Sequence, residues 1–275
     1  MELHCYRHLW GVDDAWEECF ARFAAEGYRG VEIPNVMLDA ARREALPDLL
    51  RRHGLSLILQ VFSDQWNNST DPSVHVRSLT EQVAACADLQ PQLINCHSGY
   101  DQWSSELAIG FYRELAQIGR DACAPLVHET HRGRTFFNPR DTARVLRAVP
   151  DIRLCTDLSH WFCVMERRPD DNADLALALE RTSHIHARVG YAEGPQVCEP
   201  RDPTYADELA WHEAQWDRIW DLRAAAGDEA ISLTPEFGPP PYQHTLPHSQ
   251  EPVGDLADIC LWMARRQAER FDSRA

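Results

Sequence analysis

Eight short apolar runs alternate with longer amphipathic stretches along almost the whole chain, and this alternation constrains the fold more than any other feature. The short runs have the length of buried strands, whereas the stretches between them repeat their apolar residues with helical spacing. The predicted strands are Leu3–Trp10, Gly30–Pro34, Ser56–Phe62, Leu93–His97, Leu126–Glu129, Ile152–Asp157, His184–Val189 and Ile231–Glu236. The predicted helices are Asp13–Glu26, Asp39–His53, Val74–Leu89, Ser104–Ala122, Pro139–Ala148, Asp174–Arg181, Tyr205–Ala226 and Asp255–Arg270.

Strict alternation of strands and helices over about 250 residues is typical of a parallel (β/α)8 TIM barrel. An open doubly wound sheet is the competing arrangement, but it favours a glycine-rich turn after the first strand, and residues 10–13 do not form one. Asp13 and Ser104 stand where helix N-caps are expected. We therefore expect residues 1–275 to form a single barrel domain of the α/β class.

Composition argues against several classes of function. The net charge of −16 repels phosphate backbones and anionic lipid, so neither nucleic acid nor a membrane is an expected partner. All 27 basic residues are arginine, which excludes lysine Schiff bases and P-loop lysines. Nine cysteines without a C-x-x-C pair, no signal-peptide pattern and no apolar run near the ~20 residues of a membrane span favour a cytoplasmic protein.

Acidic and imidazole side chains stand at the ends of the last four predicted strands. The sequence reads HETHR at 128–132, DLSHW at 157–161, HIHAR at 184–188 and PEFG at 235–238. Because a parallel barrel brings the carboxyl ends of all its strands to one rim, these strands deliver metal-capable side chains to the same place. Charges in a barrel mouth are costly unless they are paired or bound to a metal, so the pattern indicates a site for a divalent cation.

These motifs resemble those of the xylose isomerase-like barrels, the sugar phosphate isomerase/epimerase superfamily that also includes the apurinic endonucleases of family 2. In the ketose 3-epimerases of this superfamily, one metal ion is bound by Glu, Asp, His and Glu from strands five to eight. The resemblance implies that the ligands here are Glu129, Asp157, His186 and Glu236, with His184 as the alternative histidine. Mn²⁺ is the expected ion, with Mg²⁺, Co²⁺ and Zn²⁺ as alternatives.

The resemblance also implies an activity. Removal of a proton next to a carbonyl leaves an enediolate, whose negative oxygen a divalent cation stabilises. Glu129 and Glu236 are the implied acid and base, and His160 is expected to hydrogen-bond a substrate oxygen near the metal. We therefore expect a metal-dependent isomerase or epimerase that acts on a sugar or keto-sugar, with a homo-oligomer suggested by the family.

Further side chains at the expected barrel mouth are candidates for contacts with a sugar-like substrate. They are His97, Arg188, Glu32, Gln60, Trp161 and His131. For Glu32, Gln60 and His97, a purely structural role at the barrel mouth is the alternative. In the epimerases the arginine comparable to Arg188 comes later in the loop. Trp66 and Trp103 also follow predicted strands, and the rings of Trp66, Trp103 and Trp161 are suited either to stacking on a sugar or to anchoring their loops.

Three alternatives stay open. A lyase that eliminates water next to a keto group begins with the same proton abstraction, and dehydroshikimate dehydratases resemble this family too. An apurinic endonuclease needs three zinc ions and an Asp-x-His after the histidine of strand seven, whereas the next histidine here is His212 and the third strand offers Gln60 instead of a histidine. A non-enzymatic barrel would pair its carboxylates with Arg132, Arg134 or Arg188 and bind no metal.

Overall fold

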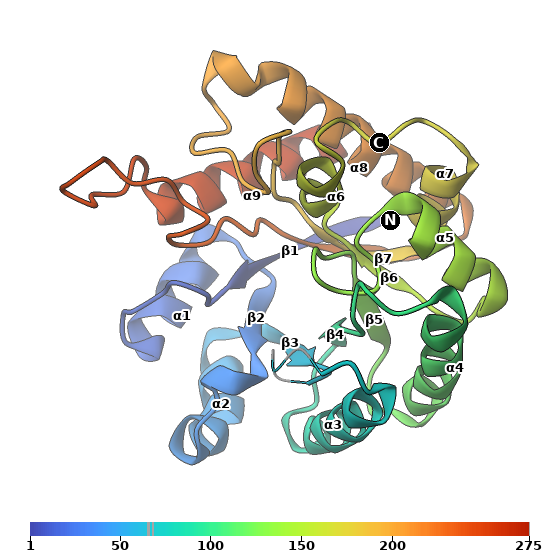
Figure 1. The fold of residues 1–275 in the computed structure, drawn as a ribbon. Coiled ribbons are helices and arrows are strands. Elements are labelled where there is room, and N and C mark those ends of the chain that lie inside the picture. Colours follow the sequence, from blue (N-terminus) through green and yellow to red (C-terminus); the bar gives the residue numbers. More distant parts are fainter. Residues whose placement is uncertain (65–66, 68, 275) are drawn as a thin grey trace.

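The computed structural model describes residues 1–64, 67 and 69–274, and they form a closed parallel barrel surrounded by helices (Figure 1). The strands are β1 (Glu2–His8), β2 (Gly30–Pro34), β3 (Ser56–Phe62), β4 (Leu93–His97), β5 (Leu126–Glu129), β6 (Leu154–Thr156), β7 (Thr182–His186) and β8 (Ala230–Thr234). Neighbouring strands pair in chain order and β1 pairs with β8, so the sheet has no free edge. The predicted (β/α)8 barrel is confirmed.

The helices form the outer layer of the molecule (Figure 1). They are α1 (Trp16–Glu26), α2 (Ala40–His53), α3 (Pro72–Ala85), α4 (Ser105–Asp121), α5 (Pro139–Ala148), α6 (Leu158–Met165), α7 (Ala173–Glu180), α8 (Ala206–Ala225) and α9 (Leu256–Asp272), with short 3-10 turns η1 (Asn35–Met37), η2 (Ala87–Leu89) and η3 (Pro203–Tyr205). Within residues 1–64, 67 and 69–274, none of the helices has both the length and the apolar composition that crossing a membrane requires.

Side chains alternate between the two faces of each strand, and this alternation decides what lies inside the barrel. Outward residues such as Val31, Leu59 and Ile94 belong to the main core between the strands and the helices. A second apolar cluster fills the barrel interior and consists of Tyr6, Ile58, Leu93, Val127 and Cys155. Two positions further along four of these strands, the buried side chains on the same face are polar: Gln60, Asn95, Glu129 and Asp157. The interior therefore changes from apolar to polar toward the carboxyl ends of the strands.

The structure corrects several predicted element ends. β1, β6 and β8 end two, one and two residues before the predicted ends, and β7 runs over Thr182–His186 in place of His184–Val189. Asp13 does not cap α1, because that helix begins after Ala15, which makes no side-chain cap. Ser104 does cap α4, since its side chain accepts a hydrogen bond from the amide of Leu107. Asp157 and Glu236 consequently lie just beyond the strands.

Helix α6 was not predicted, although it begins directly after Asp157. Five consecutive residues at its start, 158–162, are buried, so the segment shows no polar face and no helical periodicity in the sequence. Asp157 is its N-cap and accepts a hydrogen bond from the amide of Ser159 at 3.1 Å. A predicted metal ligand is therefore held in place by the start of a helix.

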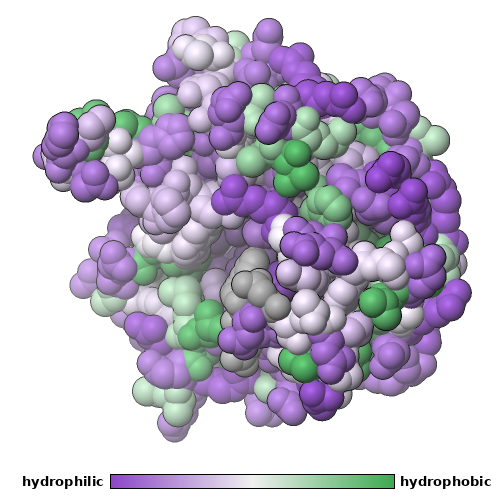
Figure 2. Space-filling view, viewed as in Figure 1, coloured by the Kyte–Doolittle hydropathy of each residue, from purple (hydrophilic) through white to green (hydrophobic). Residues whose placement is uncertain are grey.

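The connection between β8 and α9 projects from the barrel and is drawn in red-orange at the left of Figure 1. Backbone hydrogen bonds tie its two sides together, from Leu246 to Glu251 and from Val253 to His244. Figure 2 shows a mainly hydrophilic surface on this side of the molecule, as expected from the net charge of −16. The connection matters for the site because Tyr242, near its start, lines the central cavity.

Gly190 offers a test of the packing that positions α6. A β-carbon on Gly190 would lie 2.7 Å from both the Cα and the carbonyl oxygen of Ser159, and backbone atoms cannot move away cheaply. We expect Gly190→Ala to lower the free energy of unfolding by about 1–3 kcal/mol, measured by urea denaturation. Gly110→Ala is the control, because the added methyl meets no atom within 4 Å in α4 and should be neutral or stabilising. Equal denaturation midpoints for the two variants would contradict this packing.

Candidate active site

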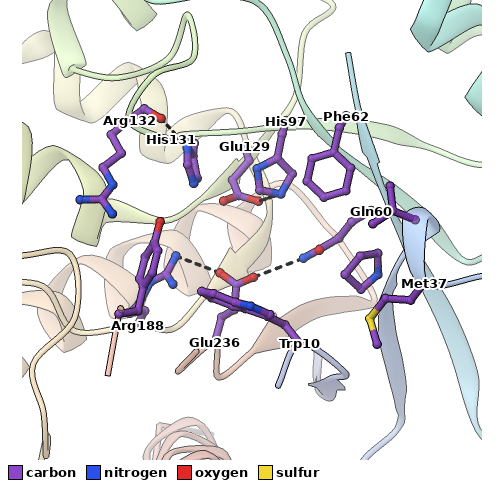
Figure 3. A pocket seen from close by; sticks show the side chains of 13 residues that line it. Trp10, Met37, Gln60, Phe62, His97, Glu129, His131, Arg132, Arg188 and Glu236 are labelled. Atoms are coloured by element: carbon purple, nitrogen blue, oxygen red, sulfur yellow. Dashed lines mark hydrogen bonds and ion pairs between the residues drawn. The ribbon is translucent and has the colours of Figure 1, made fainter. Parts of the chain in front are cut away.

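A cavity of about 520 Å³ opens at the carboxyl ends of the strands (Figure 3). It is lined by Trp10, Pro34, Val36, Met37, Gln60, Phe62, His97, Glu129, His131, Arg132, Arg188, Glu236 and Tyr242. The predicted substrate contacts Gln60, His97, His131 and Arg188 are among these residues. The volume is in the range of pockets that bind small molecules.

The four predicted metal ligands come together at this cavity, with Glu129 and Glu236 in its lining and Asp157 and His186 buried behind them. Glu129, Asp157, His186 and Glu236 are buried, and one ligand atom from each lies within 4.8 Å of the others. They come from the end of β5, the residue after β6, the end of β7 and the loop after β8. His184 is not part of this group, because it lies one inward position deeper and bonds Ser232 at 2.7 Å.

The donor atoms of this group suit a divalent cation. His186 Nδ1 lies 3.0 Å from Glu236 Oε2 and 3.4 Å from Glu129 Oε2, so its imidazole faces both carboxylates. Glu129 Oε2 also accepts from Asn95 Nδ2 at 2.9 Å, whereas Glu129 Oε1 is buried without a hydrogen-bond partner in the described part of the chain. Three carboxylates and one imidazole are donors that Mn²⁺, Mg²⁺, Co²⁺ and Zn²⁺ all accept. The residues present therefore fit such an ion.

Glu32 holds the far side of the His186 ring. Its Oε1 lies 3.0 Å from His186 Nε2, and its Oε2 lies 3.2 Å from His184 Nε2 and accepts from Thr234 Oγ1 at 2.5 Å. Burial alone would raise the pKa of Glu32, but His186 and His184 hold it well below its usual range. The contact of Glu32 with a substrate stays a prediction; in this structure the side chain is fully buried and does not line the cavity. Its position is that of a carboxylate that orients a histidine ligand.

Arg188 lies among the predicted ligands. Its Nη2 donates to Asp157 Oδ2 and, at 3.0 Å, to Glu236 Oε2, and its Nε donates to Ser159 Oγ at 3.2 Å. This is the kind of pairing that the non-enzymatic alternative predicts. It involves two of the three carboxylates, however, and Glu129 is not bonded to Arg188. Burial raises the pKa of Asp157 to about 6, and the Arg188 guanidinium opposes that rise.

Two further residues predicted to contact the substrate, His160 and Trp161, lie outside the cavity lining. His160 is fully buried and does not line the cavity, and its ring packs on that of His131 with the centroids 3.9 Å apart. His160 Nε2 lies 3.0 Å from Arg188 Nη2, which makes it a positioning residue for the guanidinium in this structure. Trp161 is part of the core, and its indole N–H donates to the carbonyl of Phe136 at 2.9 Å.

Among the other tryptophans, Trp103 donates to the carbonyl of Thr70 and lies outside the cavity lining. Trp66 lies outside the described residues. Neither residue therefore adds evidence for sugar stacking. Trp10 does line the cavity, and its ring meets that of Tyr242 edge-on at 5.0 Å.

Asn95 and Tyr242 belong to the site but were not among the predicted site residues. Asn95 donates to Glu129 Oε2 at 2.9 Å and to Glu32 Oε1 at 3.3 Å, so one amide links the predicted metal ligand to the residue that orients His186. The sequence could have indicated Asn95, because this residue precedes His97 by two positions and therefore lies on the same face of β4 as His97. No such indication exists for Tyr242, since only the folded β8–α9 connection brings it to the cavity.

A family model described as "Xylose isomerase-like TIM barrel" matches residues 20–195. The chain belongs to this family. No curated protein matches it by sequence. The family assignment agrees with the closed barrel and with the resemblance carried by the strand-end motifs.

Solved structures of the family superpose over almost the whole chain. A xylose isomerase-like TIM barrel protein from Mycobacterium smegmatis, in complex with magnesium, is 13% identical with a TM-score of 0.67, covering 98% of this chain and 97% of that one. D-Allulose 3-epimerase from Methylomonas sp., in complex with D-allulose, is 15% identical with a TM-score of 0.61 and the same coverage. The probable 3-DHS dehydratase AsbF from Bacillus anthracis is 12% identical with a TM-score of 0.63, covering 97% and 98%. At these identities the likeness shows the fold.

The role given to Glu32 can be tested by Glu32→Gln. A neutral amide stabilises the His186 ring less than the negatively charged carboxylate that lies 3.0 Å from Nε2. The affinity for Mn²⁺ should therefore fall by about 10–100-fold. The measurement is Mn²⁺ titration followed by electron paramagnetic resonance. Glu81→Gln, an exposed change on α3 with the same loss of charge, should bind the ion as the unchanged protein does. Equal affinities for all three proteins would show that Glu32 does not support His186.

The site also predicts how metal affinity depends on pH. Burial alone would lower the pKa of His186, but Cys155 and the carboxylates of Glu236, Glu32 and Glu129 raise it well above its usual value. His186 is therefore protonated near neutral pH without a metal, and a cation at Nδ1 must displace a proton. Apparent affinity should rise with pH by up to about tenfold per unit for one proton released. Isothermal titration in two buffers of different ionisation enthalpy measures the release, and identical heats would contradict it.

Proposed function

We propose that this protein is a divalent-metal-dependent isomerase or epimerase that acts on a sugar or keto-sugar. The observation that carries the proposal is the meeting of Glu129, Asp157, His186 and Glu236 within 4.8 Å, with Glu129 and Glu236 in the lining of a cavity of about 520 Å³. The proposal is supported by relatives described as an epimerase in complex with D-allulose and as a protein in complex with magnesium. Mn²⁺ is the proposed ion, with Mg²⁺, Co²⁺ and Zn²⁺ as alternatives.

Two carboxylates at the cavity are placed to move protons. Glu129 ends β5 and Glu236 follows β8, three strands further around the barrel, so they reach the cavity from different sides (Figure 3). Burial alone would raise the pKa of Glu129, but His97 and His186 hold it well below its usual range, so it is ionised and able to accept a proton. Glu236 Oε1 accepts from Gln60 at 3.3 Å, which fixes the plane of its carboxylate. A divalent ion at the site supplies electrostatic stabilisation of the negative charge that develops beside the carbonyl.

The remaining walls orient the substrate and exclude water. Trp10, Met37 and Phe62 give the cavity an apolar side against which the C–H face of a sugar can pack. Phe62 stacks on the His97 ring with the centroids 4.7 Å apart, and His97 Nε2 lies 2.9 Å from Glu129 Oε2. His97 is thus positioned both at the proposed base and at the cavity surface, where it can hydrogen-bond a substrate hydroxyl.

The test is turnover of a panel of ketohexoses and hydroxylated keto acids in D₂O with Mn²⁺, followed by NMR and mass spectrometry. Deuterium incorporated next to the carbonyl, without loss of water from the substrate, indicates isomerisation or epimerisation. Glu236→Gln should keep the fold by circular dichroism, lose bound Mn²⁺ and lower turnover by about 10²-fold or more, because a ligand and a proton carrier are removed together. Glu81→Gln is again the matched control.

Two results would overturn the proposal. Full activity in Glu236→Gln would show that the cluster is not the reacting site, and failure of the unchanged protein to bind any divalent ion would favour the non-enzymatic alternative. Loss of water from the substrate after deuterium exchange would instead assign the protein to the lyases. That outcome would keep the metal site and the proton abstraction and change only the group that leaves.

A further inference from the structure

We propose that the substrate of this site carries a carboxylate, which Arg132 and Arg188 bind beside the ring of Tyr242. The inference rests on the proposed function, because it names the class of substrate for the same cavity. It selects a monoanionic sugar acid or polyhydroxy keto acid over a neutral sugar. The case depends on an unsatisfied donor, a cation without a carboxylate partner and the planar shape of the two guanidinium groups.

The unsatisfied donor belongs to Arg188. Its side chain is 1% exposed and lines the cavity, yet Nη1 has no hydrogen-bond partner in the described part of the chain. A buried guanidinium N–H₂ without an acceptor costs free energy comparable to a lost charged hydrogen bond. Since the other nitrogens of Arg188 already bond protein atoms, the free Nη1 is available to an acceptor that enters the cavity.

The cation without a carboxylate partner is Arg132, at the wall of the same cavity. Among residues 1–64, 67 and 69–274, no carboxylate lies within 4.0 Å of its guanidinium, which contacts Cys163 Sγ at 4.0 Å and the side chain of Tyr242. Arg132 and Arg188 each place their guanidinium carbon 4.9 Å from the centre of the Tyr242 ring. Both cationic groups therefore contact the same tyrosine ring, and Figure 3 shows the two arginines on the same side of the cavity.

The chemistry of the two arginines favours a carboxylate in the ligand. Glu32, Glu129, Asp157 and Glu236 supply four negative charges when ionised, and a divalent cation together with Arg188 and Arg132 supplies four positive ones. The preference for an anion therefore rests on the two guanidinium groups at the cavity wall and not on an excess of positive charge. A carboxylate carries one negative charge and matches the planar fork of a guanidinium, whereas a phosphate monoester carries nearly two.

The same contacts predict that the metal and the anion bind cooperatively. Arg188 Nη2 bonds Asp157 and Glu236, which are also two of the four proposed metal ligands. A cation that takes these carboxylates weakens their hold on the guanidinium, so more of its N–H groups become available to a carboxylate. Thermodynamic linkage makes this effect reciprocal: if the metal increases the affinity for the anion, the anion increases the affinity for the metal by the same factor.

The experiment compares D-gluconate with D-sorbitol, two six-carbon polyols that differ by a carboxylate. Each is titrated calorimetrically into the protein at a fixed free Mg²⁺ concentration and without Mg²⁺. We expect gluconate to bind at least about tenfold more tightly than sorbitol with Mg²⁺, and less tightly when the ion is removed. Arg132→Gln and Arg188→Gln should each remove most of that preference, while Arg113→Gln, an exposed change on α4, should keep it.

Bound Mg²⁺ is measured in every variant by plasma mass spectrometry, which separates this inference from the proposed function. Equal binding of gluconate and sorbitol to Mg²⁺-loaded protein would overturn the carboxylate site and leave the metal site standing. A preference for gluconate that depends on Arg132 in a protein that binds no Mg²⁺ would support the carboxylate site and contradict the proposed function. Arg132→Gln decides the matter even if Arg188→Gln fails to fold, because Arg132 is only partly buried.

Discussion

The neutralisation of buried carboxylates is the constraint on which the rest of the site depends. Glu32, Glu129, Asp157 and Glu236 are almost completely removed from water inside a closed barrel. Each buried charge without compensation would cost several kcal/mol, so the fold must supply cations close by. His186 faces three of these carboxylates and Arg188 faces two, with Glu236 shared between them. A metal bound by Glu129, Asp157, His186 and Glu236 would replace a proton on His186 and weaken the bonds of Arg188 to Asp157 and Glu236 in a charge network that already exists.

The barrel makes that network by simple geometry. Inward positions recur every second residue, and they are apolar at Ile58, Leu93, Val127 and Cys155 but polar two residues later. The apolar layer closes the bottom of the barrel and lowers the local dielectric, which strengthens each ion pair above it. The polar layer meets the loops, where Arg132 and Tyr242 line the same cavity. The apolar packing and the proposed site are therefore separated along the barrel axis.

Much of this arrangement could be predicted, because it follows from local patterns. All eight strands were predicted within one or two residues at most ends, and the four strand-end motifs led to residues that meet within 4.8 Å. The differences between prediction and structure have physical causes. Helix α6 is buried on every side at its start and so lacks a helical period, and Trp161 within it looked like a loop residue. Glu32 and His160 were predicted to contact substrate, but the closed barrel places each beneath the cavity surface.

The sequence by itself determined the alternation of strands and helices, the face of each strand that carries acidic and imidazole groups, and the absence of lysine chemistry. These are properties of residues close together in the sequence, and the alternation of side chains along a strand decides which face of the strand each residue occupies. Only the tertiary structure decided which nitrogen of His186 faces Glu32, that Arg188 bonds Asp157 and Glu236, and that Tyr242 lies beside two arginines. Those contacts join residues far apart in the chain, and their geometry depends on barrel closure, which no local pattern encodes.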